Sequence, residues 1–201
     1  MPAEERVSPV GSVSGEVRLH RVGAADGWTP LGGFFPNAVL YDWGAVVAAL
    51  LARKGLNYAV GGMYVEFENV AAGSAAVTPP PFGRGPGEGV AYYNALADSP
   101  DRDYLRVPLV AAAVDTTDPV RYPGGNRVTF FAQTAGLAGV HGRPFTEAAR
   151  STVFGAALAA FVDPADPTRD VVFSRFYLPA SGQQPKTSGG QVGIEWRLTF
   201  L

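Results

Sequence analysis

Strict alternation of apolar and polar residues marks two segments of the chain as β-strands with one buried face. The first is the stretch 191–201, whose apolar positions are Val192, Ile194, Trp196, Leu198 and Phe200. The residues between them are Gln191, Gly193, Glu195, Arg197 and Thr199. The second is 63–69, where Met63, Val65 and Phe67 point one way and Tyr64, Glu66 and Glu68 the other. Each of these strands is predicted to turn one face to a core.

Weaker patterns predict further strands at 16–22, 104–110, 127–133 and 171–178. Within 104–110, Pro108 cannot donate a ladder hydrogen bond, which favours an edge strand or a bulge there. The run 152–162 is apolar throughout and fits either a strand buried on both faces or a buried helix. Its β-branched start and Gly155 favour the strand.

One segment has the signature of a helix. Asp42 is a plausible N-cap, and apolar residues follow at helical spacing to Leu51. Arg53, Lys54 and then Gly55 are typical of a helix C-terminus. Residues 91–97 are predicted to form a single helical turn at most.

The 25 glycines and 17 prolines are spread between many short apolar runs. This pattern predicts a mainly β fold, an antiparallel sandwich or jelly-roll with one packed α-helix. Residues 1–15 have no sustained period and are expected to be a flexible N-terminal arm, with 16–201 as a single β-rich domain. The long loop 70–90, with its Gly and Pro residues, is expected to be functional or mobile.

Composition narrows the possible partners. Charged residues make up 17% of the chain, against about 25% in average proteins. Low charge fits a surface partly covered by a partner, and equally a sequence rich in Gly and Ala. The net charge of −2 and the lack of basic runs argue against nucleic-acid binding. The polar N-terminus and the short apolar runs predict neither a secretory signal nor a membrane span, so we expect a soluble protein made in the cytoplasm.

Residues that could carry chemistry are few. Cys is absent, which excludes disulfides and thiolate metal sites. His20 and His141 are the two histidines. A triad of His141 with Ser151 and Asp166 or Asp170 is conceivable, but no nucleophile-elbow pattern supports it. Glu66 and Glu68 could be paired catalytic carboxylates, although two acids on one strand face are more often solvated.

Two other patterns have ordinary explanations. Asp163, Asp166 and Asp170 could gather around Ca²⁺, but two of them precede prolines and are expected to set turns. Glycines 83, 85, 87 and 89 lack the helix that a phosphate-binding loop needs. We therefore predict no enzyme activity, no cofactor and no metal site. Aromatic residues outside the clear strands are either core or contact surface: Trp28, Phe34, Phe35, Tyr41, Trp43, Tyr92 and Tyr93.

An ordered set of segments resembles small virion structural proteins of tailed bacteriophages over roughly residues 40–201. The segments are Asn57–Asn69, Tyr92–Leu96 followed by Arg102–Leu109, Val128–Thr134, Gly139–Gly142, Val171–Arg175 and Gln191–Trp196. No single segment is chemically diagnostic, and the order of the set carries the resemblance. The family brings no catalytic residues to this chain.

This resemblance implies a capsid decoration (cement) protein that binds and reinforces the phage capsid lattice. Its expected partners are the major capsid protein or other virion proteins, its expected location is the virion, and its expected assembly is a homotrimer. Alternatives are a tail or neck component, or a carbohydrate- or receptor-binding β-domain, which would show an exposed aromatic platform. A jelly-roll enzyme would instead need a polar pocket with perturbed carboxylates, or His141 at its base.

Overall fold

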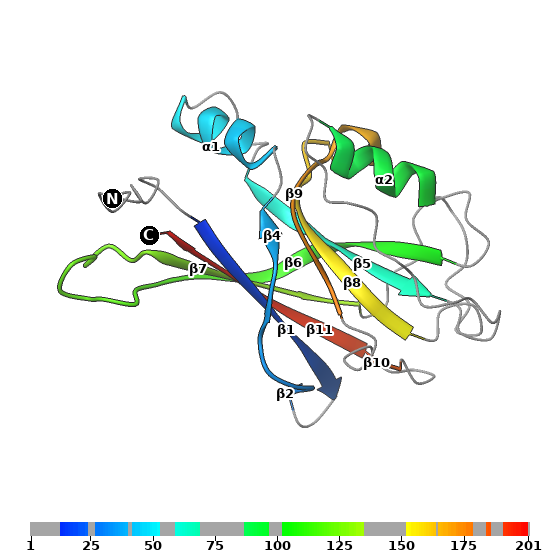
Figure 1. Ribbon diagram of the computed structural model, residues 1–201, viewed down its shortest axis with the longest axis horizontal. Helices are drawn as coiled ribbons and strands as arrows, with labels where there is room; N and C mark the ends of the chain where they lie inside the picture. The colour runs from blue at the N-terminus through cyan, green and yellow to red at the C-terminus, as the bar shows by residue number, and fades with distance from the viewer. Residues whose placement is uncertain are drawn as a thin grey trace, which may run out of the picture.

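A computed structural model describes residues 13–23, 27–39, 42–52, 59–68, 87–96, 102–134, 152–163, 165–178, 184–185 and 191–200. Antiparallel strands, two short α-helices and one 3₁₀-helix (Pro167–Arg169) make up the regular structure of these residues (Figure 1). The strands are β1 (Val13–Gly23), β2 (Gly27–Pro30), β3 (Phe35–Pro36), β4 (Ala38–Val39), β5 (Val60–Glu68), β6 (Arg102–Asp115), β7 (Arg127–Gln133), β8 (Thr152–Ala160), β9 (Val171–Tyr177), β10 (Gln184–Pro185) and β11 (Gln191–Phe200).

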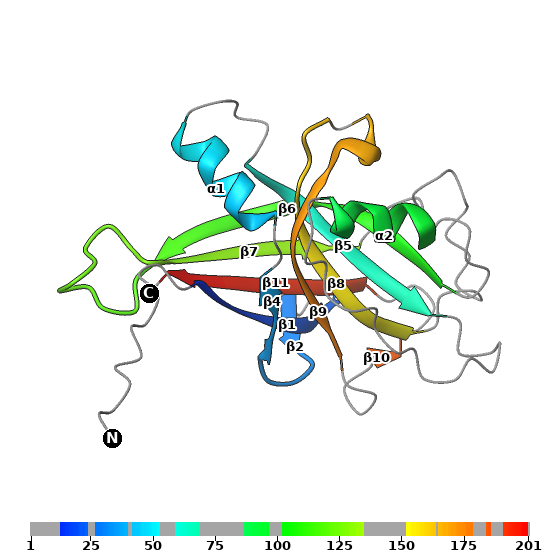
Figure 2. The same cartoon turned by 45° about the horizontal axis from the view of Figure 1, so that its top comes forward.

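The strands form one sheet in the order β2-β1-β11-β7-β6-β5-β8-β9-β4, with β3 paired to β1 and β10 to β8. The sheet curls so that its two halves enclose a common core, as Figures 1 and 2 show. Phe176 of one half meets Trp196 of the other edge to face, with ring centroids 5.7 Å apart. The prediction of a mainly β, antiparallel, sandwich-like fold is confirmed.

The inner face of β11 consists of the apolar residues that the alternation predicted. Val192, Ile194, Trp196 and Leu198 are buried in the core, and Phe200 at the end of the strand is partly exposed. β1 begins at Val13, three residues before the predicted start of the domain, and pairs with β11 along its length. Residues 1–12 of the predicted arm lie outside the described residues.

β6 joins the two halves and explains Pro108. Residues 102–108 pair with β5, whereas Leu109 and the residues from Ala111 to Asp115 pair with β7. The register shifts between Leu109 and Ala111, so Val110 bulges where the strand changes partner. The bulge was predicted. The predicted edge fits as well, because residues 102–108 pair with β5 alone among the described strands and have one unpaired edge, although β6 lies in the middle of the sheet order.

Helix α1 (Trp43–Leu51) closes one end of the core. Trp43 packs between Phe173 and Phe200, at centroid distances of 5.2 and 6.0 Å. Asp42 occupies the N-cap position as predicted, but its side chain makes no capping hydrogen bond to the helix. Its carboxylate instead accepts a hydrogen bond from the backbone N–H of Gly87 at 2.9 Å. Arg53, Lys54 and Gly55 lie outside the described residues.

The expectation of a single packed helix needs correction. Residues 88–96 form a second helix, α2 (Glu88–Leu96), which packs on the outer face of β5, β6, β8 and β9. Tyr93 of α2 is fully buried there against Tyr64 and Tyr104. This cover explains why β8 is buried on both faces, as its continuous apolar sequence predicts. No described helix is long and apolar enough to cross a bilayer.

Candidate functional site: the outer face of β1, β11 and β7

Polar residues of three neighbouring strands form ladders across the outer face of the sheet. The registers place Ser14, Thr199 and Arg127 in one row and Glu16, Arg197 and Thr129 in the next. Two further rows are Arg18, Glu195, Phe131 and His20, Gly193, Gln133. Directly opposed side chains on one sheet face touch, so opposite charges at these positions stabilise the pairing. The polar half of each alternating pattern therefore builds a continuous charged surface.

Glu195 is the centre of this surface and is almost fully buried. Its Oε2 accepts hydrogen bonds from Nε and Nη2 of Arg18, at 3.1 and 2.7 Å. Its Oε1 accepts from Nε and Nη2 of Arg197, at 3.1 and 2.7 Å. Burial opposes ionisation of Glu195, but the hydrogen bonds from Arg18 and His20 outweigh it and lower the pKa of the carboxyl. The group is a fixed anion held by two arginines.

His20 lies beside Glu195 and is also buried. Its Nε2 is 2.9 Å from Glu195 Oε2. Burial lowers the pKa of His20 below its ordinary value of 6.5, and the hydrogen bond to Glu195 offsets this only in part. His20 is therefore neutral at pH 7, with Nε2–H donating to the carboxylate and Nδ1 left as an acceptor.

Aromatic side chains from residues 27–36 cover the charged surface. Phe34 lies under the guanidinium groups of both Arg18 and Arg197, 4.2 and 4.0 Å from its ring centroid. Trp28 packs on His20, with ring centroids 5.3 Å apart. Gly193 leaves space for this indole, because a Cβ there would lie 2.8 Å from Trp28 Cζ3. The aromatic residues are half-buried by these contacts and do not form the exposed platform of a carbohydrate-binding domain.

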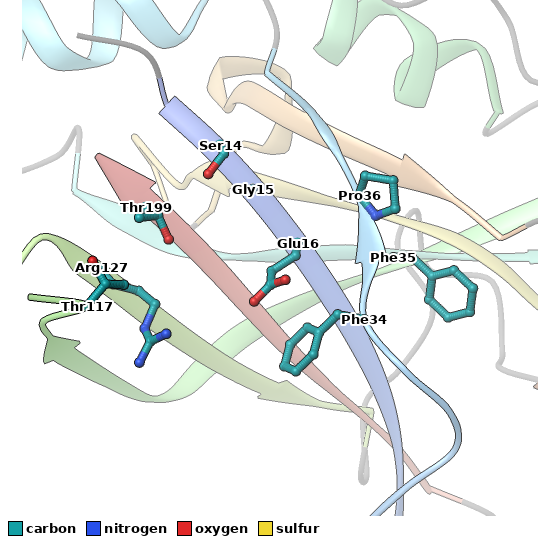
Figure 3. Close-up of a pocket in the computed structure, with 9 residues that line it drawn as sticks. All are labelled: Ser14, Gly15, Glu16, Phe34, Phe35, Pro36, Thr117, Arg127 and Thr199. Carbon is teal, nitrogen blue, oxygen red and sulfur yellow. The ribbon is translucent and has the colours of Figure 1, made fainter. Parts of the chain in front are cut away.

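Two cavities open on this face. One, of about 430 Å³, lies between β1, the β3 segment and the start of β7 (Figure 3). Figure 3 shows Glu16 and Phe34 side by side, with Arg127 across β11 from them. Arg127 is already ion-paired with Asp115. The other cavity, of about 300 Å³, is lined by His20, Trp28, Val110, Ala111 and Phe131.

The opposite half of the sheet buries a second set of charges beneath α2. Glu66, predicted to be solvated, is fully buried, and this prediction is wrong because α2 covers the outer face of β5. Its carboxylate accepts from the hydroxyls of Tyr93 and Tyr92, at 2.5 and 3.0 Å. Arg175, also buried, lies 3.6 Å from Glu66 and stacks on Tyr92. The side chain of Glu68 lies outside the described residues.

Asp170 is the second anion of this buried set. Arg106 holds it through two hydrogen bonds of 2.7 and 2.8 Å, and Tyr64 O–H donates to it at 2.5 Å. Burial, together with Asp170, raises the pKa of the Tyr64 phenol, which stays protonated as the donor. Asp166 and Asp163 do set turns, since each accepts a backbone N–H two residues on. No group of acidic or histidine side chains within the described ranges could hold a metal ion.

Sequence reasoning missed the buried state of Glu66, Glu195 and Asp170, each of which pairs with an arginine from a distant strand. His141 and Ser151 of the conceivable triad lie outside the described residues. Comparison with protein families, with curated proteins and with solved structures finds no match to this chain.

Proposed function

We propose that the protein is a structural virion component that docks on the capsid lattice of a tailed bacteriophage and reinforces it. The observation that carries the proposal is an exposed apolar strand edge on β6. Val110 and Val114 are 54% and 68% exposed, and the three alanines between them are exposed as well. Among the described residues, β7 pairs with one edge of this stretch and no strand pairs with the other.

An open, apolar strand edge is a site for pairing with another chain. Its unpaired N–H and C=O groups supply main-chain hydrogen bonds, and its side chains supply apolar contact. Monomeric proteins usually protect such edges with Lys, Pro or a covering loop. The β6–β7 connection also projects beyond the body of the molecule in both views, which makes this edge accessible (Figures 1 and 2).

The state of the buried charges supports binding rather than catalysis. Glu66, Asp170 and Glu195 each pair with an arginine. For Glu195, the hydrogen bonds from Arg18 and His20 lower the pKa, so this carboxylate stays ionised and is not available as a general acid near pH 7. Such pairs fix the positions of strands, which suits a rigid docking module.

The test is co-sedimentation with empty capsids of the phage whose genome encodes the chain. Wild-type protein should bind saturably. Ala112→Lys and Val114→Lys place a charge on the open edge and should weaken binding about tenfold or more while leaving the melting temperature unchanged. The matched control is Leu51→Lys, because Leu51 is 80% exposed and belongs to α1, not to β6. Equal binding by the edge variants, or no binding by wild type, would contradict the proposal.

A further inference from the structure

Strand β2 is an edge strand with few attachments to the rest of the fold. It ends the order of the sheet and, among the described strands, pairs with β1 alone, between Gly23 and His20 (Figure 1). None of its four residues is buried, and Trp28 is the one that is partly covered. Segments with little buried surface open locally at a small cost in free energy. β2 can therefore leave the sheet while the core stays folded.

Trp28 is the side chain that holds β2 on the outer face. Its indole reaches over Gly193 of β11 to Phe131 of β7, where the ring centroids are 5.7 Å apart. The same indole packs on the ring of His20, with a centroid distance of 5.3 Å and an interplanar angle of 57°. His20 is only 5% exposed although its side chain belongs to the outer face. Trp28 is therefore part of the cover that keeps water from this imidazole.

The surroundings of His20 suit a neutral ring. Its Nε2 lies 2.9 Å from Glu195, and its Nδ1 is buried without a hydrogen-bond partner among the described residues. The charges that face the ring are Glu195, Arg18 and Arg197. The residues of β2 and the adjoining positions of β6 and β7 are uncharged. A proton on Nδ1 would add a third cation beside one buried carboxylate and would leave a buried donor unsatisfied.

We propose that β2 is a pH-sensitive strap, which is released from β1 when His20 takes up a proton at Nδ1. Release lets water reach the imidazolium and removes the burial that opposes its charge. It also uncovers Phe131, which lines a cavity together with Val110 and Ala111 of the open β6 edge. The strap thus increases the apolar surface of the outer face in mildly acidic surroundings. This inference does not depend on docking to a capsid.

The direction of the pH response follows from the two states of His20. Burial lowers its pKa while β2 is in place, whereas an exposed histidine has a pKa near the ordinary value of 6.5. The state with the higher pKa gains population as the pH falls, so acid favours the open strap. The strap is closed above pH 6.5 and opens below it. The pKa of Glu195 is lowered from its ordinary value of 4.5, so this carboxylate stays ionised over the same range.

The experiment follows the three tryptophans of the whole protein at pH 7 and at pH 5. Isotope-labelled tryptophan gives one indole N–H signal for each residue in an NMR spectrum, and a neutral gadolinium chelate broadens the signals that solvent reaches. Trp28→Phe assigns the signal of Trp28. That signal should broaden about threefold more at pH 5 than at pH 7. The signal of Trp196, which is fully buried in the core, should not change.

Two variants remove the group that takes up the proton. His20→Gln keeps a neutral side chain that can donate to Glu195, and His20→Phe keeps a ring on which Trp28 can pack. Both should lose the difference between pH 7 and pH 5. His141→Asn is the matched control, because it removes the other histidine of the chain and should keep the difference. A difference that persists in both His20 variants, or that disappears in His141→Asn, would overturn the proposal.

Three results on the wild-type protein would also overturn the strap. Equal broadening of Trp28 at both pH values would show that β2 stays closed. Less broadening at pH 5 would show that the indole holds the imidazolium through a cation–π contact. Equal increases for Trp28 and Trp196 would show that the whole domain unfolds, instead of one strand being released.

Discussion

Trp196 is the largest side chain that the inner face of β11 buries completely. Its indole N–H has no hydrogen-bond partner among the described residues, contrary to the usual expectation for a buried Trp. Trp196→Ala should therefore cost about 3–5 kcal/mol through the cavity alone. Trp196→Phe should cost less than half of that, because no hydrogen bond is lost. Urea unfolding followed by circular dichroism measures both.

The control for Trp196 is its neighbour on the opposite face. Arg197 is 25% exposed at its side chain and pairs with Glu195 and Glu16. Arg18 keeps Glu195 paired when Arg197 is absent, so Arg197→Ala should fold with a loss of about 1 kcal/mol. A soluble Trp196→Ala of normal stability that fails only in docking would show that this face is a contact surface instead of the core.

His20 makes the stability depend on pH. Burial lowers its pKa in the folded protein, so the unfolded chain binds a proton more readily below pH 6.5. The charges that face it are Glu195, Arg18 and Arg197. The contribution of neutral His20 to the unfolding free energy should be complete above pH 6.5. It should be lost as the pH falls through the pKa of His20 in the folded protein. His20→Phe should flatten the fall in unfolding free energy between pH 7 and 5, and an unchanged slope would contradict the assignment.

Single residues were predictable where one strand pattern decided their environment. The period of two placed Trp196, Val65 and Leu105 in the core, and all three are buried. It also placed Glu66 and Glu195 on polar faces, but polar did not mean solvated. Glu66 is covered by α2, and Glu195 is held by Arg18 and Arg197, on which Phe34 stacks. A local pattern carries no information about packing from a distant segment.

At the scale of elements, α2 is attached to the sheet through hydroxyl groups as well as rings. Tyr93 O–H donates to buried Glu66, and Tyr92 O–H donates to the same carboxylate. Tyr93→Phe leaves Glu66 with one fewer donor and should cost about 1–3 kcal/mol. Hydrogen exchange of the α2 amides should rise more than that of β11. Tyr122→Phe, on the β6–β7 connection, is the control, and equal effects of the two variants would contradict this role for Glu66.

Elements whose own sequence has a strong hydrophobic period were predicted correctly. Elements that depend on packing against distant segments were not. β5, β7, β9 and β11 follow predicted strands closely. α2 was underestimated because Gly87 and Gly89 precede its apolar residues and weaken the helical signal. Gly89 is required there, since a Cβ would lie 2.8 Å from Val172 Cβ. Gly89 therefore weakens the helical pattern in the sequence and also allows α2 to pack against β9.

For the whole molecule, the sequence predicted the class but not the curl of the sheet. The curl depends on β6, which changes partner at a bulge, and on pairings such as β1 with β11 that join the two ends of the chain. The same change of partner leaves the second half of β6 with one free edge. The curl therefore produces the surface on which docking is proposed.

The low charge of the chain leads to an expectation for the assembly as a whole. A self-associating surface on a small protein is most often used in a closed symmetric oligomer, and we expect a homotrimer in solution or on the particle. Light scattering of wild-type protein and of Leu51→Lys should give three times the chain mass. Val114→Lys should give the same mass, because the open edge of β6 is proposed to bind the capsid and because pairing of this edge with its own copy would close a dimer instead of a trimer. Monomer mass for wild type at every concentration, together with isolated single copies in a particle image, would refute the trimer. Loss of the trimer in Val114→Lys would place self-association on the β6 edge and would contradict the assignment of that edge to the capsid.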